Sequence, residues 1–411
     1  MQAKSLNNHS VSKTEKIQKT ESNTFWKKLV FQQFSKIKSG TLIILDHEKI
    51  LSFGEMTNLK ATIVIHDSSF YKKVIMNGTM SVAEMYMDEG WDCEDLESLF
   101  RLFAAQRELV SKLDSGFSLL MRPFLKFQEW MNENTILGSR KNISAHYDLG
   151  NDFFKLFLDK TMMYSSGMFR NTEDLYTASV KKCDAICQKL ELKSTDHLIE
   201  IGTGWGYFAI HAAKNYGCKV KSVTLSVEQK KIAEERITEE NLQGLISVEL
   251  MDYRNIKGNF DKLVSIEMIE AVGHEYLGTY LEKCHSLLKD KGIAVFQAIT
   301  IPDYAYDEHL KSMDFIQKYI FPGSKIPCVA EILKHTKSST QLVLTGMEDI
   351  ALDYAKTMRH WHQRFKCNLN TIKQQGYSNR FLRMWEYYLL YCCAGFEERY
   401  LGTVQLQFCK L

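Results

Sequence analysis

Three alternating glycines at the end of an apolar run have the clearest chemical meaning in this chain. Gly202, Gly204 and Gly206 follow Leu198–Ile201, which has the composition of a β-strand, and they precede a segment with helical character. Glycines at a strand–helix turn allow the backbone to approach a ligand closely. The pitch is G-x-G-x-G and differs from the G-x-G-x-x-G of dinucleotide folds. The turn therefore predicts a ligand site of another kind.

The charge at the turn narrows the class of ligand. Glu200 enters the turn, and a carboxylate there would repel phosphate, which favours a helix N-terminus free of negative charge. It suits an amine and a positive sulfonium, and S-adenosylmethionine carries both. The next strand ends in Thr224, Leu225 and Ser226, followed by Gln229, where an NAD site would place an acidic residue. Ser226 and Gln229 also predict a capping box.

Strands and helices alternate around this turn from about residue 176 onward. Expected helices cover 176–191, 227–238 and 276–289, and a further helix ends at Tyr216 before Gly217. This alternation predicts a doubly wound parallel sheet, an α/β Rossmann-like domain. The expected strands are His197–Ile201, Lys219–Thr224, Ile246–Leu250, Lys262–Ile266 and Ile293–Ile299.

The remainder of the chain predicts a second, smaller α+β domain. We expect a disordered basic tail at 1–24, an N-terminal domain at 25–115, a linker at 116–140 and the α/β domain at 141–411. The N-terminal domain contains β-branched runs at 40–45 and 61–65 and helical periodicity at 81–89 and 96–109. Around the linker, basic residues such as Arg122 and Lys126 alternate with aromatic ones. Such a segment more often packs as an amphipathic helix than lies on an anionic membrane, and both interpretations stay open.

Composition excludes several classes of function. The net charge is +2, so nothing favours nucleic acid as a partner. The first ten residues contain no apolar segment typical of a secretory signal, and the longest apolar run, Tyr387–Phe396, is too short to span a bilayer. His360 and His362 are spaced i, i+2 and share no helix face, and the cysteines lack ligand spacing, so we predict no metal site.

Eight segments in one order resemble the cyclopropane-fatty-acyl-phospholipid synthase and mycolic acid cyclopropane synthase family. The resemblance covers about residues 141–410 and is far more specific than the glycine turn alone. The 40–110 region also looks like the N-terminal domain of the longer members. The matching segments are Ala145–Phe154, Met163–Phe169, Ile199–Gly206, Thr224–Gln229, Asp252–Arg254, Glu267–Gly273, Phe315–Gly323 and Tyr387–Phe396.

The resemblance implies which residues hold S-adenosylmethionine. Aromatic faces such as that of Tyr164 can attract a sulfonium. The implied cofactor-binding residues are Tyr164, Ser165, Glu200, Gly202, Thr203, Gly204, Trp205, Gly206, Thr224, Leu225, Ser226, Gln229, Tyr253 and Arg254.

The resemblance also implies a bound bicarbonate or carbonate ion that acts as base after methyl transfer to an alkene. Its positions correspond here to Ser166, Glu270, Gln297, the Ile299 backbone and Tyr354. Ser166 stands in place of a cysteine and Gln297 in place of a histidine. Both can donate hydrogen bonds to an oxyanion, but the two changes put the ring-closing step in question.

The function implied is S-adenosylmethionine-dependent methylene transfer to unsaturated phospholipid acyl chains, forming cyclopropane fatty acids. The alternatives are a fatty-acyl C-methyltransferase giving a methyl branch, an amine N-methyltransferase, and a lipid-binding protein without turnover. Peripheral contact with membrane phospholipids and a homodimer are expected from the resemblance. A cytoplasmic location at the inner face of the membrane is expected with them.

Overall fold

The computed structural model describes residues 24–47, 49–55, 59–106 and 149–411. The chain divides into two compact units, one formed by residues 1–126 with 377–394 and the other by residues 127–376 with 395–411. The basic tail and the segment containing Arg122, Lys126 and His146 lie outside the described residues.

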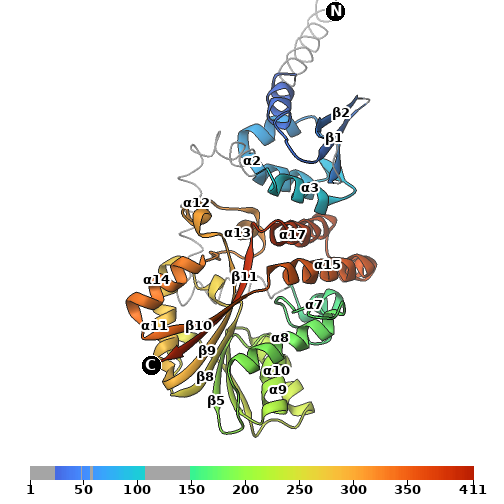
Figure 1. Cartoon of the computed structure of the whole chain (residues 1–411). Coiled ribbons are helices and arrows are strands. Elements are labelled where there is room, and N and C mark those ends of the chain that lie inside the picture. Colours follow the sequence, from blue (N-terminus) through green and yellow to red (C-terminus); the bar gives the residue numbers. More distant parts are fainter. Residues whose placement is uncertain (1–23, 48, 56–58, 107–148) are drawn as a thin grey trace, which may run out of the picture. The chain divides into compact units, whose positions relative to one another are not determined.

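The first unit contains a four-stranded sheet with the order β2-β1-β3-β4 (Figure 1). Strands β1 and β3 are parallel, and β2 and β4 run antiparallel to their neighbours. The runs at 40–45 and 61–65 form β1 and β3, so these two strand predictions are confirmed. The bounds are β1 Thr41–Asp46, β2 Lys49–Gly54, β3 Lys60–Ile65 and β4 Trp91–Cys93.

Two helices of the N-terminal region accompany this sheet. Helix α2 covers Phe70–Met87 and starts eleven residues before the predicted Ser81, with non-helical backbone at Gly78. Helix α3 covers Leu96–Ala104, and Asp95 caps its N-terminus by accepting from the Ser98 amide.

A third helix of this unit comes from near the other end of the chain. Helix α17 covers Asn379–Glu397, and its residues up to Ala394 belong to the first unit. The Tyr387 ring lies 4.7 Å from that of Phe100, and Arg383 donates to an Asp92 carboxylate oxygen at 2.6 Å. Packing, rather than local sequence, therefore assigns this helix to its unit.

The second unit is built on a seven-stranded sheet with the order β10-β11-β9-β8-β5-β6-β7. The strands from β7 to β9 are parallel, and β11 is antiparallel to both β9 and β10. The predicted α/β parallel sheet is confirmed; β10 and β11 are additions to it. The bounds are β5 His197–Ile201, β6 Lys219–Thr224, β7 Ile246–Leu250, β8 Phe260–Ile266, β9 Leu288–Thr300, β10 Leu342–Asp349 and β11 Gly402–Lys410.

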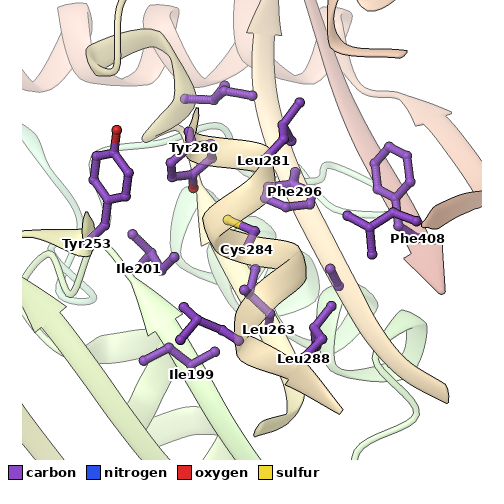
Figure 2. Close-up of a cluster of buried hydrophobic side chains, with 14 of the residues drawn as sticks. Ile199, Ile201, Tyr253, Leu263, Tyr280, Leu281, Cys284, Leu288, Phe296 and Phe408 are labelled. Carbon is purple, nitrogen blue, oxygen red and sulfur yellow. The ribbon is translucent and has the colours of Figure 1, made fainter. Parts of the chain in front are cut away.

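Alternate strand residues enter two different cores. Ile199 and Ile201 pack with helix α11 (Leu277–Leu287) on one face, as Figure 2 shows. Leu198, one residue before Ile199 and therefore on the opposite face of the strand, packs with α8 (Leu175–Lys189) and α9 (Tyr207–Tyr216). A period of two with apolar residues on both faces is typical of strands covered on both sides.

The remaining helices of the second unit lie before, between and after its strands. Those after β5 and β6 begin at the carboxyl edge of the sheet, where ligands bind in open α/β folds. Their bounds are α7 Asn151–Phe157, α10 Val227–Glu239, η1 Tyr253–Asn255, η2 Ile269–Ala271, η3 His274–Tyr276, η4 Asp303–Ala305, α12 Tyr306–Lys311, α13 Phe315–Tyr319, α14 Val329–Ser339, α15 Ala351–Cys367 and α16 Leu369–Gln374.

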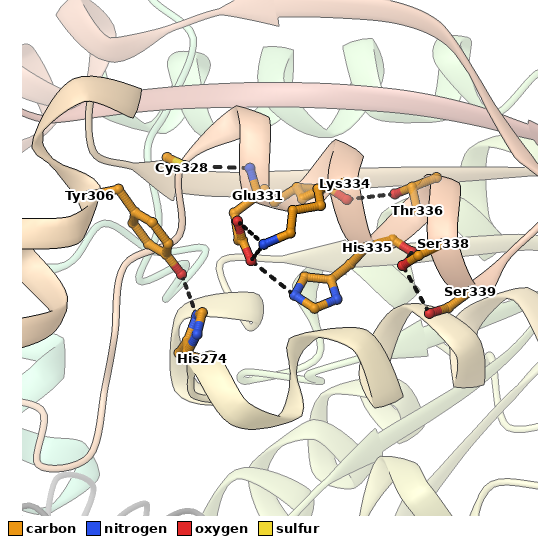
Figure 3. A network of polar contacts seen from close by, with 10 residues as sticks. His274, Tyr306, Cys328, Glu331, Lys334, His335, Thr336, Ser338 and Ser339 are labelled. Carbon is orange, nitrogen blue, oxygen red and sulfur yellow. Dashed lines mark hydrogen bonds and ion pairs between the residues drawn. The ribbon is translucent and has the colours of Figure 1, made fainter.

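Polar contacts hold the segment that carries α12 to α14 against the short helices η2 and η3 that follow β8. The Tyr306 hydroxyl lies 2.7 Å from His274 Nδ1, and Glu331 contacts both Lys334 and His335 (Figure 3). The Lys325 amide donates to the Glu270 carbonyl at 3.0 Å. This segment therefore borders the end of β8. None of the described helices is both long and apolar enough to cross a bilayer.

Candidate active site

The glycine turn joins β5 to α9 with three residues of positive φ. Gly202, Gly204 and Gly206 have φ values of +101°, +52° and +84°. A Cβ atom on Gly202 would meet Met268 Cγ at 2.7 Å, and one on Gly206 would meet Ala233 Cβ at 2.9 Å, whereas one on Gly204 would meet nothing within 4 Å. The outer glycines are thus required by packing, and the central one faces open space where a ligand can approach.

Glu200 is the second-last residue of β5 and is almost fully buried. Its carboxylate accepts from the Ser222 hydroxyl on β6, and the Thr203 hydroxyl lies 2.7 Å from the same Ser222 oxygen. Burial raises the pKa of Glu200 to about 8, opposed by the Ser222 hydrogen bond and by the charge of Lys182. One hydrogen bond and one lysine charge do not offset the burial of this carboxylate, so the site suits a cationic ligand group.

Lys182 on α8 is a second buried charge that the sequence analysis did not single out. Its side chain is fully buried, and Nζ donates to Ser165 Oγ at 2.7 Å. Burial lowers its pKa, while the charges of Glu267, Asp159 and Glu200 oppose that change. The lysine thus fixes Ser165, a predicted cofactor residue, and supplies a positive charge among several carboxylates.

The end of β6 forms a hydrogen-bonded turn. Thr224 Oγ1 accepts from the Ser226 amide at 3.1 Å and donates to Gln229 Oε1 at 2.9 Å. Ser226 caps α10 by accepting from the Gln229 amide at 3.2 Å, as predicted. The other hydrogen bond of the predicted capping box, from the Ser226 amide to the Gln229 side chain, was wrong, because the Gln229 side chain accepts from Thr224 instead. Leu225 is the half-buried residue of this turn.

Tyr253 and Arg254 follow β7 at the same edge of the sheet. The Tyr253 ring packs edge-on against Tyr280, with centroids 5.0 Å apart (Figure 2). Arg254 makes a two-pronged pair with buried Asp252, with Nε and Nη2 each 2.9 Å from a carboxylate oxygen. The guanidinium is thereby held in place by its neighbour.

Tyr164 and Trp205 belong to an aromatic cluster. The Tyr164 ring centroid lies 5.2 Å from Trp361, 5.4 Å from Phe154 and 6.2 Å from Phe321. Trp205 is buried, and its Nε1 donates to Asn151 Oδ1 at 2.7 Å. Trp205 therefore attaches the glycine turn to α7, while Tyr164 is only partly buried and can offer a ring face to a sulfonium.

The five residues predicted to hold an anion do lie together, but three of them bind a carboxylate of the protein. Glu267, directly after β8, accepts from the Ser166 amide at 2.9 Å, from Gln297 Nε2 at 2.8 Å and from the Tyr354 hydroxyl at 2.7 Å. The Ser166 hydroxyl does not take part, since it donates to the Gly167 carbonyl at 2.9 Å. Glu267, like Lys182, was not among the site residues predicted from the sequence.

Glu270 completes this cluster. One of its carboxylate oxygens accepts from the Ile299 amide, and the other, buried, has no hydrogen-bond partner among the described residues. Burial and the charge of Glu267 raise the pKa of Glu270 to about 8. Burial also raises the pKa of Glu267, although its three hydrogen bonds and the charge of Lys182 oppose the rise.

The cluster does not fit an added bicarbonate ion. The donors of Ser166, Gln297 and Tyr354 are directed at Glu267, and the Ile299 amide at Glu270. An anion placed beside these two carboxylates would meet negative charge without a free donor from the expected set. Among the described residues, no group of His, Cys, Asp and Glu could hold a metal ion.

These features together define a class of protein. The parallel sheet with its single reversed strand and the glycine turn after β5 are those of the class I S-adenosylmethionine-dependent methyltransferase fold. The solved structure of mycolic acid cyclopropane synthase CmaA1 complexed with SAH and CTAB has this fold. It matches with a TM-score of 0.62 and 27% identity, over 66% of this chain and 98% of that chain.

Sequence comparison leads to the particular family. The model of the family described as mycolic acid cyclopropane synthetase matches residues 137–406. Tuberculostearic acid methyltransferase UfaA1 of Mycobacterium tuberculosis is 34% identical over 343 residues, 81% of this chain and 79% of that protein. Cyclopropane-fatty-acyl-phospholipid synthase of Escherichia coli K12 is 34% identical over 355 residues, 85% and 88% respectively. The chain therefore belongs to the mycolic acid cyclopropane synthetase family.

Proposed function

We propose that the protein transfers the methyl carbon of S-adenosylmethionine to the double bond of an unsaturated phospholipid acyl chain and closes a cyclopropane ring. The observation that carries this proposal is the pair Glu267 and Glu270 after β8, beside the cofactor turn after β5. Strands β5 and β8 are adjacent and parallel, so both features lie at one edge of the sheet. An alkene needs an electrophilic methyl group on one side and a proton acceptor nearby, and this edge provides places for both.

The proposed cofactor site uses the chain's own charges. Bound there, S-adenosylmethionine supplies an electrophilic methyl group. Glu200 would hold its ammonium group, the ring of Tyr164 would face the sulfonium, and the open side of Gly204 would admit the backbone of the ligand. The β6 turn at Thr224–Gln229 and Tyr253 after β7 would hold the nucleoside end.

A methyl-branched product is the second candidate, since one relative is named a tuberculostearic acid methyltransferase. Loss of a proton from a neighbouring carbon, instead of from the new methyl group, would give a branch and no ring. The two outcomes share every step up to the proton transfer. Methylation of a soluble amine would instead leave the acyl chains unchanged.

The test is to incubate the protein with S-adenosylmethionine and vesicles of a monounsaturated phospholipid, and to analyse the acyl chains by mass spectrometry and NMR. We expect a gain of one CH2 with loss of the vinyl protons and appearance of cyclopropane protons. A gain of CH2 with a methyl branch and an alkene kept within the chain would support the branched product. Unchanged acyl chains in the presence of bound cofactor would refute an acyl substrate. Turnover on an added amine would then support amine methylation instead. Sedimentation of the protein with the same vesicles tests the proposed peripheral contact.

A further inference from the structure

The carboxylate of Glu267 lies where the expected bicarbonate ion would receive its hydrogen bonds. Three donors converge on it from elements far apart in the sequence: the Ser166 amide, Gln297 on β9 and Tyr354 on α15. Resting on the proposed function, we infer that Glu267 is itself the base that removes the proton after methyl transfer, and that the enzyme needs no bicarbonate.

A chain of amides holds Gln297 in the orientation that donates to Glu267. Gln405 on β11 donates from Nε2 to Gln297 Oε1 at 2.9 Å, and Lys189 in turn donates to the Gln405 side-chain oxygen. Gln297 and Gln405 are direct partners in the antiparallel register of β9 and β11. The Gln297 amide nitrogen is thereby directed at Glu267 at 2.8 Å, with the Ser166 carbonyl farther away at 3.5 Å, so this position is built to receive an acceptor.

The backbone at Glu267 is strained in a way that supports a chemical role. Its φ is +51°, in the left-handed region that residues other than glycine rarely adopt. The surroundings enforce it, since β8 ends at Ile266 and the Glu267 amide donates to the Gln297 carbonyl at 2.7 Å. Strain that is held by neighbouring structure is concentrated at functional sites. The left-handed turn directs the carboxylate toward Tyr354 and Ser166.

The local charge also favours one carboxylate base over an added anion. Glu270 is close enough for its pKa to be raised by Glu267, and the charge of Lys182 opposes the rise that burial causes in the pKa of Glu267. A bound bicarbonate ion would bring a third negative charge to a site that already holds two carboxylates and one lysine. Glu267 keeps part of its surface accessible in spite of its hydrogen bonds.

The step balances without any further reactant. The alkene electron pair forms a bond to the methyl carbon as the carbon–sulfur bond breaks, which leaves a positive charge on the other alkene carbon. The Glu267 carboxylate takes a proton from the new methyl group. The electron pair of that C–H bond forms the second ring bond to the positive carbon. The neutral carboxylic acid then returns its proton to solvent.

The experiment compares the unaltered protein with Glu267→Gln, Glu267→Gly and the control Glu282→Gln, an exposed glutamate on α11. Each is assayed on monounsaturated vesicles in bicarbonate-depleted buffer and again with added bicarbonate, and S-adenosylmethionine binding is measured by calorimetry. We expect the unaltered protein and the control to be active without bicarbonate. Glu267→Gln should lose at least about 100-fold in turnover while it still binds cofactor, because general-base catalysis contributes about this much.

Glu267→Gly tests the site directly, since glycine accepts the left-handed backbone and frees the three donors. We expect bicarbonate to restore part of its turnover. The inference is overturned if the unaltered protein depends on bicarbonate, if Glu267→Gln keeps more than about a tenth of the turnover, or if bicarbonate fails to restore Glu267→Gly. Cofactor binding with no lipid product from any of the proteins would instead refute the proposed function, and the inference with it.

Discussion

The ionisation of Glu200 should control how tightly the cofactor binds near neutral pH. Burial raises the pKa of this carboxyl to about 8 in the absence of ligand. Only the ionised form can attract the ligand's ammonium and sulfonium groups, so a proton must leave when the ligand binds. Each pH unit below 8 then costs about a factor of ten in affinity. We expect the dissociation constant to be about 100-fold weaker at pH 6 than at pH 9, and about tenfold weaker at pH 7.

Calorimetry across this pH range measures the effect. Below pH 8, buffers with different heats of ionisation should report the release of nearly one proton on binding. Glu200→Gln should bind weakly at every pH and lose this dependence. The control Glu234→Gln changes an exposed glutamate on α10 and should keep the slope of the unaltered protein. The amino group of the ligand titrates in all three titrations, so its contribution cancels when the proteins are compared.

The same ionisation predicts the opposite slope for folding stability. A carboxyl whose folded pKa is above its unfolded value of 4.5 binds more protons in the folded state. Its contribution to the free energy of unfolding therefore falls as pH rises from about 4.5 to about 8. Glu200→Gln should lose this fall in cofactor-free protein. A ligand affinity that is flat from pH 6 to pH 8, or a slope that persists in Glu200→Gln, would refute the assignment of Glu200.

Three further predictions concern packing and charge. Gly202→Ala should lower the melting temperature by several degrees, because its methyl group would meet a methionine side chain at 2.7 Å. Gly204→Ala should fold with only the left-handed strain of about 1–2 kcal/mol but bind cofactor more weakly. Equal melting temperatures for the two variants would contradict this. Lys182→Met removes the buried cation and should shift the pH midpoint of cofactor binding upward; an unchanged midpoint would show that its charge is not felt at the site. Arg383→Met should weaken hydrogen-exchange protection of β4 by about 1–3 kcal/mol, whereas Arg380→Met, an exposed pair, should change it by less than about 1 kcal/mol.

Much of the second unit could be predicted because its signals are local. The strand runs alternate by two, and glycine or a capping side chain marks where helices begin and end, as at Gly217 and Ser226. The predicted β5, β6 and β7 have the observed bounds. Strand β10 escaped notice because most of its residues are exposed, which leaves no apolar alternation to detect.

The site was predicted less completely than the fold. The family resemblance implied that Ser166, Gln297 and Tyr354 surround one bound ion, and the structure does bring them together. It did not indicate that they bind a carboxylate of the protein. Glu267 lies inside a motif that the sequence analysis quoted, and a second acidic residue three positions before Glu270, directly after a strand, was the available signal. Only the three-dimensional contacts reveal that its carboxylate fills the position expected for an ion.

Helix α17 and Lys182 show where sequence reasoning ends. The aromatic residues of α17 have the same pattern whether the helix packs on one unit or the other, and only contacts such as Tyr387 with Phe100 decide between them. Lys181 and Lys182 are adjacent and chemically identical, yet the first is half-exposed and the second fully buried. Which of the two lysines is buried depends on which face of α8 meets the sheet.

The charges of the site connect cofactor binding to the proposed base. Without ligand, the charge of the buried cation Lys182 acts on Glu200 and Glu267, and burial raises the pKa of both and of Glu270. A cationic ligand would lower these pKa values and favour the ionised forms before the reaction. Once the methyl group has left sulfur, that positive charge is on the acyl chain, next to the carboxylate proposed to accept its proton. The pKa of Glu267 then rises again as the charge is lost, so the proton is taken up at the step that needs it. This coupling requires Glu267 to be ionised when substrate binds. At saturating cofactor and a fixed concentration of the bicarbonate ion, the turnover rate should therefore rise with pH in the unaltered protein and lose that rise in Glu267→Gly.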